Sequence, residues 1–382
     1  MTVINSIADL RERARRRIPR AIFEYADRGS YDEVTFRRNR HDLEALAFRQ
    51  RVMVDVSKQA LATTLLGEPA AIPLAIAPTG LTGLFHADGE MLGARAAEAF
   101  GIPFCLSTMS ICSIEDVRSV TKKPFWFQIY LMRERSFNME LIERAKAAQC
   151  STLVLTVDLP IMGLRRRDAK NGLSIPPKLT FGNLFDVATK PAWGLKVLFG
   201  RRRTFGNLED LMKRSGGSLT TLSAWIASQF DPTVTWADIE WVRKAWPGKL
   251  IIKGVLDAED ARHACAAGVD GIVVSNHGGR QLDGAPSTIS VLPEIVDAVQ
   301  GRCEVLFDGG VQSGQDILKA LALGARGCLI GKTFLYALAA GGEAGVTQAL
   351  GILRDELRVS LALTGGADVR SVDSSILRTA RT

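Results

Sequence analysis

The chain has 382 residues, of which 47% are hydrophobic and 23% charged, and this composition excludes global disorder. Its formal charge of +7 indicates an anionic partner, but the arginines carry no nucleic-acid motif and no interleaved stacking aromatic residues, so no nucleic-acid binding is expected. No apolar run approaches the roughly 18 residues of a spanning helix, and Met1–Arg17 is too polar for a secretory signal.

Residues 1–66 are expected to form helices, including Ile4–Arg17 and Pro19–Asp27, that cap one end of the domain that follows. Short β-branched or aromatic runs then recur, each followed by a helical pattern with apolar residues at three- and four-residue spacing. The predicted strands are Ile72–Ala77, Pro103–Leu106, Phe125–Ile129, Thr152–Val157, Leu250–Lys253, Gly271–Val274, Glu304–Phe307 and Gly327–Ile330. The predicted crossover helices include Asn138–Gln149, Ala258–Ala267 and Gln315–Leu323. Eight strand–helix units predict an α/β fold, a closed (β/α)8 TIM barrel spanning residues 67–382.

The regular spacing breaks between the fourth and fifth strands, where residues 176–231 form an insertion. A loop of this length is usually functional or disordered. It includes a mixed apolar and basic stretch, Pro191–Arg203, and the Gly/Ser-rich Ser215–Ser218. The residues Trp193, Leu195, Val197, Leu198 and Phe199, beside Lys196 and Arg201–Arg203, fit a membrane interface. Packing of the insertion against a neighbouring subunit explains the same pattern equally well.

The six cysteines are scattered without a C-x-x-C pair, and several fall in or beside apolar runs. This usage is typical of reduced thiols in a cytosolic protein. No metal site is expected.

Active sites of such barrels lie at the carboxyl ends of the strands, so the polar residues that follow each strand are the candidates. The rim residues are Pro78, Thr79, Gly80, Ser107, Gln128, Tyr130, Thr156, Asp158, Lys253, Ser275, His277, Arg280, Asp308, Gly309, Gly310, Gly331 and Lys332, with Arg165 further along. His277 has the right pKa range to accept a hydroxyl proton near neutral pH. Asp158 is suited to orient its ring, although capping of the next helix is an alternative role.

Two arginines are candidates for gripping a substrate carboxylate. Arg280 presents a planar fork that suits a carboxylate in a bidentate pair. Arg165 could be a second clamp, but Arg165–Arg167 is equally well explained as a solvated basic face. The glycines around His277 allow close backbone approach to a ligand.

Lys253 ends a strand that is otherwise apolar, so its ammonium group is expected to be positioned and partly desolvated. It could form a Schiff base, supply positive charge to a cofactor that becomes anionic on reduction, or belong to a structural ion pair. The segments Asp308–Gly310 and Gly331–Lys332 fit a phosphate site after strands seven and eight. No G-x-G-x-x-G follows an early strand, which disfavours a Rossmann nicotinamide site.

These motifs resemble the FMN-dependent 2-hydroxy acid dehydrogenases and oxidases, which include lactate and mandelate dehydrogenases and glycolate oxidase. The most specific match is SNHGGRQLDG (Ser275–Gly284). The supporting segments, in family order, are Ala77–Gly83, Leu106–Thr108, Trp126–Tyr130, Thr156–Asp158, Ile252–Gly254 and Asp308–Gly310.

The resemblance implies FMN on the barrel rim, with Pro78, Thr79, Ser107, Gln128 and Thr156 around the ring and Lys253 beside its N1 and C2 carbonyl. It implies His277 as base and Asp158 as its partner. It further implies that Arg165 and Arg280 bind the substrate carboxylate, that Tyr25 and Tyr130 lie near the substrate, and that the protein is a homotetramer.

The chain departs from the family pattern near the cofactor phosphate, where Gln312 and Lys332 stand in place of the usual arginines. Weaker FMN binding is one expectation, and compensation by Arg302 or Arg326 is the other. Met109 stands where glycolate oxidases carry tryptophan, and Gly80 where some members carry alanine. Both changes open the pocket and argue against glycolate.

The insertion resembles that of the membrane-associated lactate and mandelate dehydrogenases, and no N-terminal haem domain like that of flavocytochromes is seen. The leading hypothesis is therefore an L-lactate dehydrogenase at the cytoplasmic side of the inner membrane that passes electrons to a quinone or cytochrome. The alternatives are a mandelate or longer 2-hydroxy acid dehydrogenase, an oxygen-using oxidase, and a flavin barrel that modifies a peptide or isoprenoid. Sequence does not separate hydride transfer from carbanion formation, because both use His277.

Overall fold

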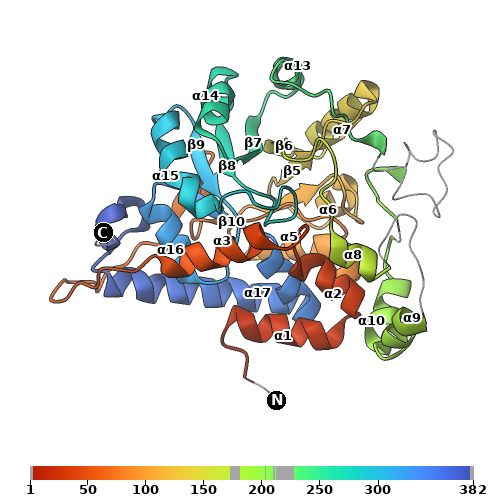
Figure 1. Cartoon of the computed structure of the whole chain (residues 1–382), viewed down its shortest axis with the longest axis horizontal. Helices are drawn as coiled ribbons and strands as arrows, with labels where there is room; N and C mark the ends of the chain where they lie inside the picture. Colours follow the sequence, from red (N-terminus) through yellow and green to blue (C-terminus); the bar gives the residue numbers. More distant parts are fainter. Residues whose placement is uncertain (1–2, 173–180, 203, 210, 212–227, 379–382) are drawn as a thin grey trace.

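The computed structural model describes residues 3–172, 181–202, 204–209, 211 and 228–378. Its centre is an eight-stranded parallel sheet with hydrogen-bonded order β3-β10-β9-β8-β7-β6-β5-β4 (Figure 1). A parallel bridge between Ile76 and Phe104 joins the two outer strands, so the sheet closes. The strands are β3 (Leu74–Ile76), β4 (Cys105–Ser107), β5 (Trp126–Ile129), β6 (Thr152–Thr156), β7 (Lys249–Val255), β8 (Gly271–Val274), β9 (Glu304–Phe307) and β10 (Gly327–Ile330). The prediction of a TIM barrel is confirmed.

A two-stranded hairpin plugs the amino-terminal end of the barrel. It comprises β1 (Thr63–Leu65) and β2 (Glu68–Ala70), joined by Leu66 and Gly67, both at positive φ, as a tight hairpin turn requires. Its side chains Leu65 and Leu66 are buried in one apolar cluster with the inward-facing strand residues, including Trp126. The expectation of helices throughout residues 1–66 is therefore wrong for Thr63–Leu65, because this short strand pairs through a turn in which leucine takes the place of the usual asparagine or aspartate.

Helices surround the barrel. They are α4 (Thr82–Phe85), α5 (Gly89–Phe100), α6 (Ile114–Arg118), α7 (Arg135–Ala147), α8 (Arg166–Lys170), α13 (Asp238–Ala245), α14 (Ala258–Ala266), α15 (Thr288–Val299), α16 (Gly314–Ala322) and α17 (Lys332–Leu363), with 3-10 turns at Val369–Ser371 and Ser374–Ile376. The predicted crossover helices correspond to α7, α14 and α16. Gly342, at φ +61°, interrupts α17.

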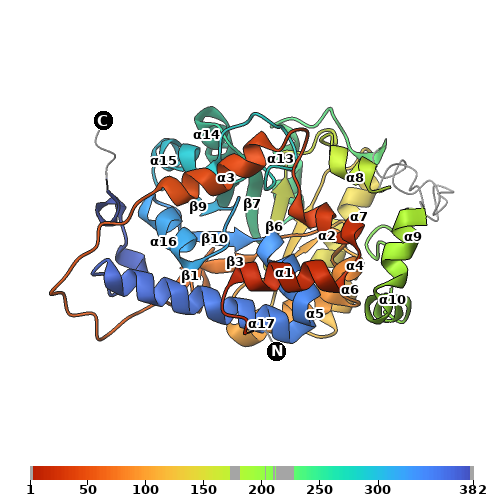
Figure 2. The ribbon, with the colours of Figure 1, turned by 60° about the horizontal axis from the view of Figure 1, so that its bottom comes forward.

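The N-terminal segment supplies α1 (Ile7–Arg17), α2 (Arg20–Asp27) and α3 (Val34–Ala45). Helix α1 begins at a capping box between Ser6 and Asp9 and packs along α17 (Figure 2). Helix α3 reaches the loop after β8, where the side-chain amides of Asn39 and Asn276 bond each other at 2.9 and 2.8 Å. The N-terminal helices therefore hold the loop that carries His277.

Two helices of the insertion, α9 (Phe181–Ala188) and α10 (Pro191–Leu198), stand at one edge of the molecule, beside the C-terminal end of α1 (Figures 1 and 2). The Gly/Ser-rich Ser215–Ser218 lies outside the described residues. Within the described ranges, no helix combines the length and the apolar character needed to cross a bilayer.

Candidate active site

A cavity of about 460 Å³ lies at the carboxyl ends of the strands. Most of the predicted site residues line it: Tyr25, Pro78, Thr79, Ser107, Tyr130, Arg165, Lys253, His277, Arg280, Asp308, Gly309, Gly310, Gly331 and Lys332. The remaining four, Gln128, Thr156, Asp158 and Ser275, lie behind its wall. Each contacts a residue that lines the cavity. Gln128 is bonded to Ser107, and Asp158 is bonded to His277. Thr156 pairs with Lys253 in the sheet, and Ser275 is bonded to Lys253. The structure thus brings all of the predicted residues to one rim.

His277 and Asp158 form a hydrogen-bonded pair at this rim. The Nδ1 of His277 lies 2.9 Å from Oδ1 of Asp158, and the two side chains are 21% and 10% exposed. His277 has a left-handed backbone, with φ +57°, a conformation that is uncommon for a residue other than glycine. Gly254 makes room for the pair, because a Cβ at that position would lie 2.6 Å from Cβ of Asp158.

His277 and Asp158 have the protonation states that a general base and its carboxylate partner require. Burial lowers the pKa of His277 below its ordinary value, although Asp158 opposes the shift, so the imidazole is neutral near pH 7. Burial alone would raise the pKa of Asp158, but the nearby His277 and Lys253 outweigh it and keep the carboxyl group ionised. A neutral imidazole backed by a carboxylate can accept a proton and then be stabilised as imidazolium.

Lys253 is buried between two polar partners. Its ammonium donates to Oγ of Ser275 at 2.7 Å and lies 3.0 Å from Oδ2 of Asp308. Burial disfavours the charged form, but Asp308 and Asp158 outweigh it and raise the pKa of Lys253. The lysine is therefore a fixed cation. This favours the role of supplying positive charge to a cofactor over that of a Schiff-base amine, since Schiff-base formation needs a neutral nitrogen.

Arg280 is held in place by Tyr25. Its guanidinium donates to the Tyr25 carbonyl oxygen and lies 4.5 Å from the centre of the Tyr25 ring. Nε of Arg165 donates to the carbonyl oxygen of Arg280 at 3.4 Å, so the two arginines are neighbours on the cavity wall. Two adjacent guanidinium groups in a partly enclosed cavity favour an anionic ligand.

Several buried side-chain polar atoms have no hydrogen-bond partner within the described part of the chain, and three of them belong to predicted cofactor-binding residues: Nε2 of Gln128, Oγ1 of Thr156 and Oδ1 of Asp308. Buried polar groups are normally satisfied, so unpaired atoms near one cavity indicate a polar ligand. The ring nitrogens and carbonyl oxygens of a flavin present both donors and acceptors, which suits this set. The residues therefore fit the FMN that the sequence resemblance implies.

The glycine-rich loop at the far end of the cavity fits a phosphate. Gly309 and Gly310 have φ values of +106° and +96°, and a Cβ at Gly309 would lie 2.4 Å from Oγ1 of Thr288. Gly331 and Lys332 begin helix α17, whose amino-terminal N–H groups favour anions. Nζ of Lys332 donates to the Arg28 carbonyl oxygen at 3.1 Å.

Compensation for Gln312 by Arg302 or Arg326, one of the two expectations, is wrong. Arg302 donates to carbonyl oxygens at the end of α15, and Arg326 donates to Thr64 at the amino-terminal end of the barrel, so neither reaches the cavity. Arg40 of helix α3 lines it instead, with NH1 2.7 Å from both the Gly310 carbonyl oxygen and Oδ2 of Asp316. Sequence gave no signal for Arg40, because it lies far from the barrel strands along the chain.

The cavity also contains residues that sequence reasoning missed. Asp168 of α8 lies beside Arg280 and Arg165; burial raises its pKa, although the arginines oppose the shift. Phe205 and Phe230, from the C-terminal part of the insertion, complete the apolar wall, and Phe230 packs edge-on against Tyr130 with 5.3 Å between ring centres.

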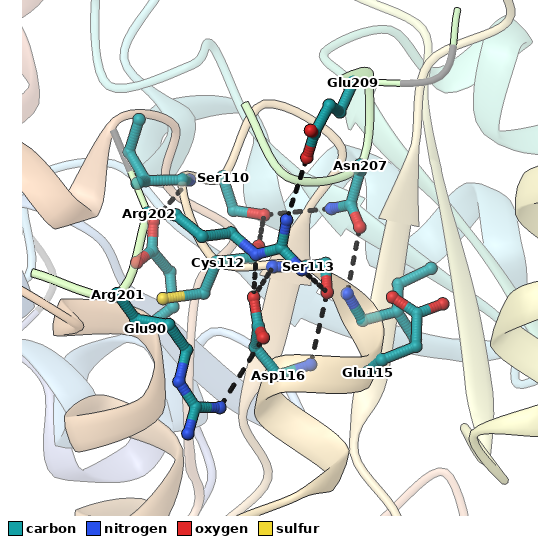
Figure 3. Close-up of polar contacts among 12 residues, drawn as sticks. Glu90, Ser110, Cys112, Ser113, Glu115, Asp116, Arg201, Arg202, Asn207 and Glu209 are labelled. Carbon is teal, nitrogen blue, oxygen red and sulfur yellow. Dashed lines mark hydrogen bonds and ion pairs between the residues drawn. The ribbon is translucent and has the colours of Figure 1, made fainter. Parts of the chain in front are cut away.

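The segment around Phe205 is bound firmly to the barrel (Figure 3). Arg202 pairs with Asp116 of α6 and with Glu209, the latter at 3.0 Å. The side chain of Asn207 accepts from the Ile114 amide at 2.9 Å and donates to the Ser107 carbonyl oxygen at 3.2 Å. A Cβ at residue 206 would lie 2.7 Å from the Ser113 nitrogen, so only glycine allows this close approach.

Comparison with known proteins agrees with this geometry. The family model described as FMN-dependent dehydrogenase matches residues 14–379. An L-lactate dehydrogenase of Caulobacter vibrioides (strain NA1000 / CB15N) is 51% identical over 98% of both chains. An L-lactate dehydrogenase of Chromohalobacter salexigens is 47% identical over 99% of this chain and 96% of its own.

Solved structures give the same result. The crystal structure of a monotopic membrane protein, (S)-mandelate dehydrogenase, superposes with a TM-score of 0.93 at 37% identity, covering 99% of this chain and 100% of the other. A mandelate oxidase superposes with a TM-score of 0.82 at 38% identity, covering 98% of each chain. With a family model across nearly the whole chain and relatives of this similarity, the chain belongs to the FMN-dependent dehydrogenase family.

Proposed function

We propose that the protein oxidises an L-2-hydroxy acid, L-lactate in the first place, to the 2-oxo acid. The observation that carries the proposal is the His277–Asp158 pair, which faces a cavity that also contains two neighbouring arginines. Such a site combines a general base with a carboxylate clamp. The name L-lactate dehydrogenase, carried by relatives up to 51% identical, supports lactate as the substrate.

In this proposal, Arg280 and Arg165 bind the substrate carboxylate, while Tyr25 and Tyr130 complete the wall beside it. His277 accepts a proton from the substrate, and Asp158 stabilises the imidazolium that results. Bound FMN supplies the two-electron acceptor, so that the substrate loses two electrons and two protons in all. Lys253 carries a fixed positive charge that would stabilise the negative charge that FMN gains on reduction.

We further propose that the protein is peripheral to the cytoplasmic side of the inner membrane and passes its electrons to a quinone or cytochrome. Helices α9 and α10 support this, because Phe185, Leu195 and Phe199 are 73%, 57% and 79% exposed. Exposed large apolar side chains beside basic residues are typical of an interfacial segment. The description of the mandelate dehydrogenase as a monotopic membrane protein agrees with this proposal.

A larger substrate such as (S)-mandelate is the second candidate, and the apolar wall favours it. Met109, Phe205, Phe230 and Leu81 line the cavity, which could accommodate an aromatic substituent. Gly80 keeps this wall open, since a Cβ there would lie 3.2 Å from Cβ of Met109. The same wall argues against glycolate, which has no side chain to fill it.

Anaerobic reduction of the flavin spectrum by L-lactate, L-mandelate, glycolate and longer 2-hydroxy acids tests the reaction and ranks the substrates. Rapid bleaching by L-lactate is the expected result. A flavin that none of these acids reduces would refute the proposal and favour a barrel that modifies a peptide or isoprenoid. Stoichiometric hydrogen peroxide under air would instead identify an oxidase and refute the quinone or cytochrome acceptor.

A further inference from the structure

A second cavity, of about 280 Å³, lies outside the active site. It is enclosed by helix α10, by the C-terminal end of α1, by His86 after α4 and by Gly341 of α17. The C-terminal end of α1 points toward α10 (Figures 1 and 2), and residues of both helices line the cavity. Nothing in the proposed oxidation uses these residues.

Four cations line this cavity: Arg16, Arg17, Lys190 and Lys196. No carboxylate accompanies them among the described lining residues. Three of the four bond neutral acceptors. Lys190 donates to the Arg16 carbonyl oxygen at 2.8 Å, Arg17 donates to the Ala340 carbonyl oxygen, and Lys196 donates to Nε2 of His86 at 3.3 Å.

A carbonyl oxygen or an imidazole satisfies a donor without cancelling its charge, so the cavity keeps a net positive charge. Arg16 differs, because it pairs with Glu12 at 2.7 Å, but that carboxylate also serves Arg15. Excess positive charge in a partly enclosed cavity attracts an anion with several acceptor oxygens, as a phosphate has.

His86 adds a hydrogen-bonding wall to this cavity. Its Nδ1 lies 2.9 Å from the Ala87 carbonyl oxygen, which makes Nδ1 the donor and leaves Nε2 to accept from Lys196. Burial lowers the pKa of His86, and the charges of Lys196 and Arg17 add to this effect, so the ring is neutral near pH 7. The positive charge of the site is therefore carried by the lysines and arginines.

Helix α10 presents two different faces. Trp193 and Lys196 face the cavity, and the Trp193 indole donates to the Leu84 carbonyl oxygen at 2.7 Å. Leu195 and Phe199, the residue that follows the helix, do not line the cavity, and their side chains are exposed to solvent. A cationic cavity on one face of a short helix and exposed apolar side chains on the other match the two parts of a phospholipid.

We propose that this cavity binds the phosphate of an anionic phospholipid headgroup, while Leu195 and Phe199 contact the acyl region of the same leaflet. The inference rests on the proposed membrane association and deepens it, because it assigns lipid selectivity to particular residues. It predicts preference for anionic over zwitterionic lipid, since a choline or ethanolamine group would bring a positive charge to a positive site.

The test uses the FMN-loaded protein and co-sedimentation with phosphatidylcholine vesicles, with and without phosphatidylglycerol, at about 0.15 M salt. The double variant Lys190→Gln/Lys196→Gln removes two cavity charges. The matched control Arg13→Gln/Lys170→Gln removes two exposed charges outside the cavity. We expect the cavity variant to lose about 25-fold in affinity for phosphatidylglycerol vesicles and the control less than fivefold.

Two results would contradict the proposal in distinguishable ways. Equal losses in the two variants, with wild-type binding intact, would refute the headgroup site and leave membrane association standing. A wild-type protein that sediments with no vesicles would refute membrane association itself, and with it the headgroup site.

A second measurement separates a lipid headgroup from free phosphate. Dihexanoyl-phosphatidylglycerol below its micellar concentration is titrated against the emission of Trp193, with Trp193→Phe as the blank. A saturable response to this lipid, but not to dihexanoyl-phosphatidylcholine or inorganic phosphate, is the expected result. An equal response to inorganic phosphate would overturn the assignment to a lipid.

Discussion

Replacement of Asp158 by asparagine tests the electrostatic role of the His277 partner. Asparagine preserves the shape of the side chain and removes its charge. An ion pair at this separation is worth about 4 kcal/mol at the effective dielectric constant of about 20 that suits such sites. The ion pair exists only once His277 becomes an imidazolium, so it stabilises the transition state and not the ground state. Its loss in the asparagine variant should therefore lower kcat/KM by about three orders of magnitude.

The pH profile distinguishes this effect from simple damage. A base must be neutral to accept a proton, so kcat/KM falls as the pH drops through the pKa of His277, which burial already holds below its ordinary value. Asp158 raises that pKa, so the acid limb of the variant should move to still lower pH while the plateau falls. The assay is anaerobic stopped-flow reduction of the flavin, with the flavin spectrum as the control for cofactor retention. A plateau within threefold of wild type, or a limb that moves to higher pH, would refute the reasoning.

Three further variants probe the same cavity. His277→Gln should retain its flavin spectrum and lose at least about 100-fold in turnover, and near-normal kcat would refute its role as base. Arg280→Lys should lower kcat/KM about 10- to 100-fold, mainly through KM, because lysine keeps the charge but lacks the fork and the stacking on Tyr25; an unchanged KM in steady-state assays would count against the clamp. Gln312→Arg should tighten FMN binding about tenfold in a titration of the apoprotein, whereas Arg302→Gln, outside the cavity, should leave it unchanged; equal affinities in all three proteins would show that residue 312 does not meet the phosphate.

The barrel was predictable because each parallel strand is a short apolar run that a polar rim residue follows. Buried parallel strands read this way along the chain, and the alternation with helices fixes the topology. The hairpin of Thr63–Leu65 and Glu68–Ala70 was not recognised, because its strands are short and its turn uses Leu66 rather than the asparagine or aspartate that usually signals a hairpin.

The rim residues of the site were predictable for the same reason, since each follows a strand. Arg40, Asp168, Phe205 and Phe230 were not, because they come from helices or from the insertion and reach the cavity only through tertiary packing. Periodicity gives no information on where such segments lie. The cation near Gly310 shows the same limit. Arg302 was a candidate because it is close to Gly310 along the chain, but Arg40 is the residue that lies close to it in space.

The attachment of the insertion has a practical consequence for separating the two proposed properties of the protein. Residues of α9 and α10 touch the body of the molecule at its edge, whereas Arg201 and Asn207 are bonded to α6 and Phe205 between them supplies a wall of the active site (Figure 3). Excision of residues 176–228 would therefore remove Phe205 and Asn207 together with the helices, and a loss of activity could not be assigned to either. A replacement confined to residues 181–199 would exchange the helices proposed to contact the membrane and leave the active-site wall intact. The insertion therefore consists of two parts that can be exchanged independently, one for membrane binding and one for substrate selectivity.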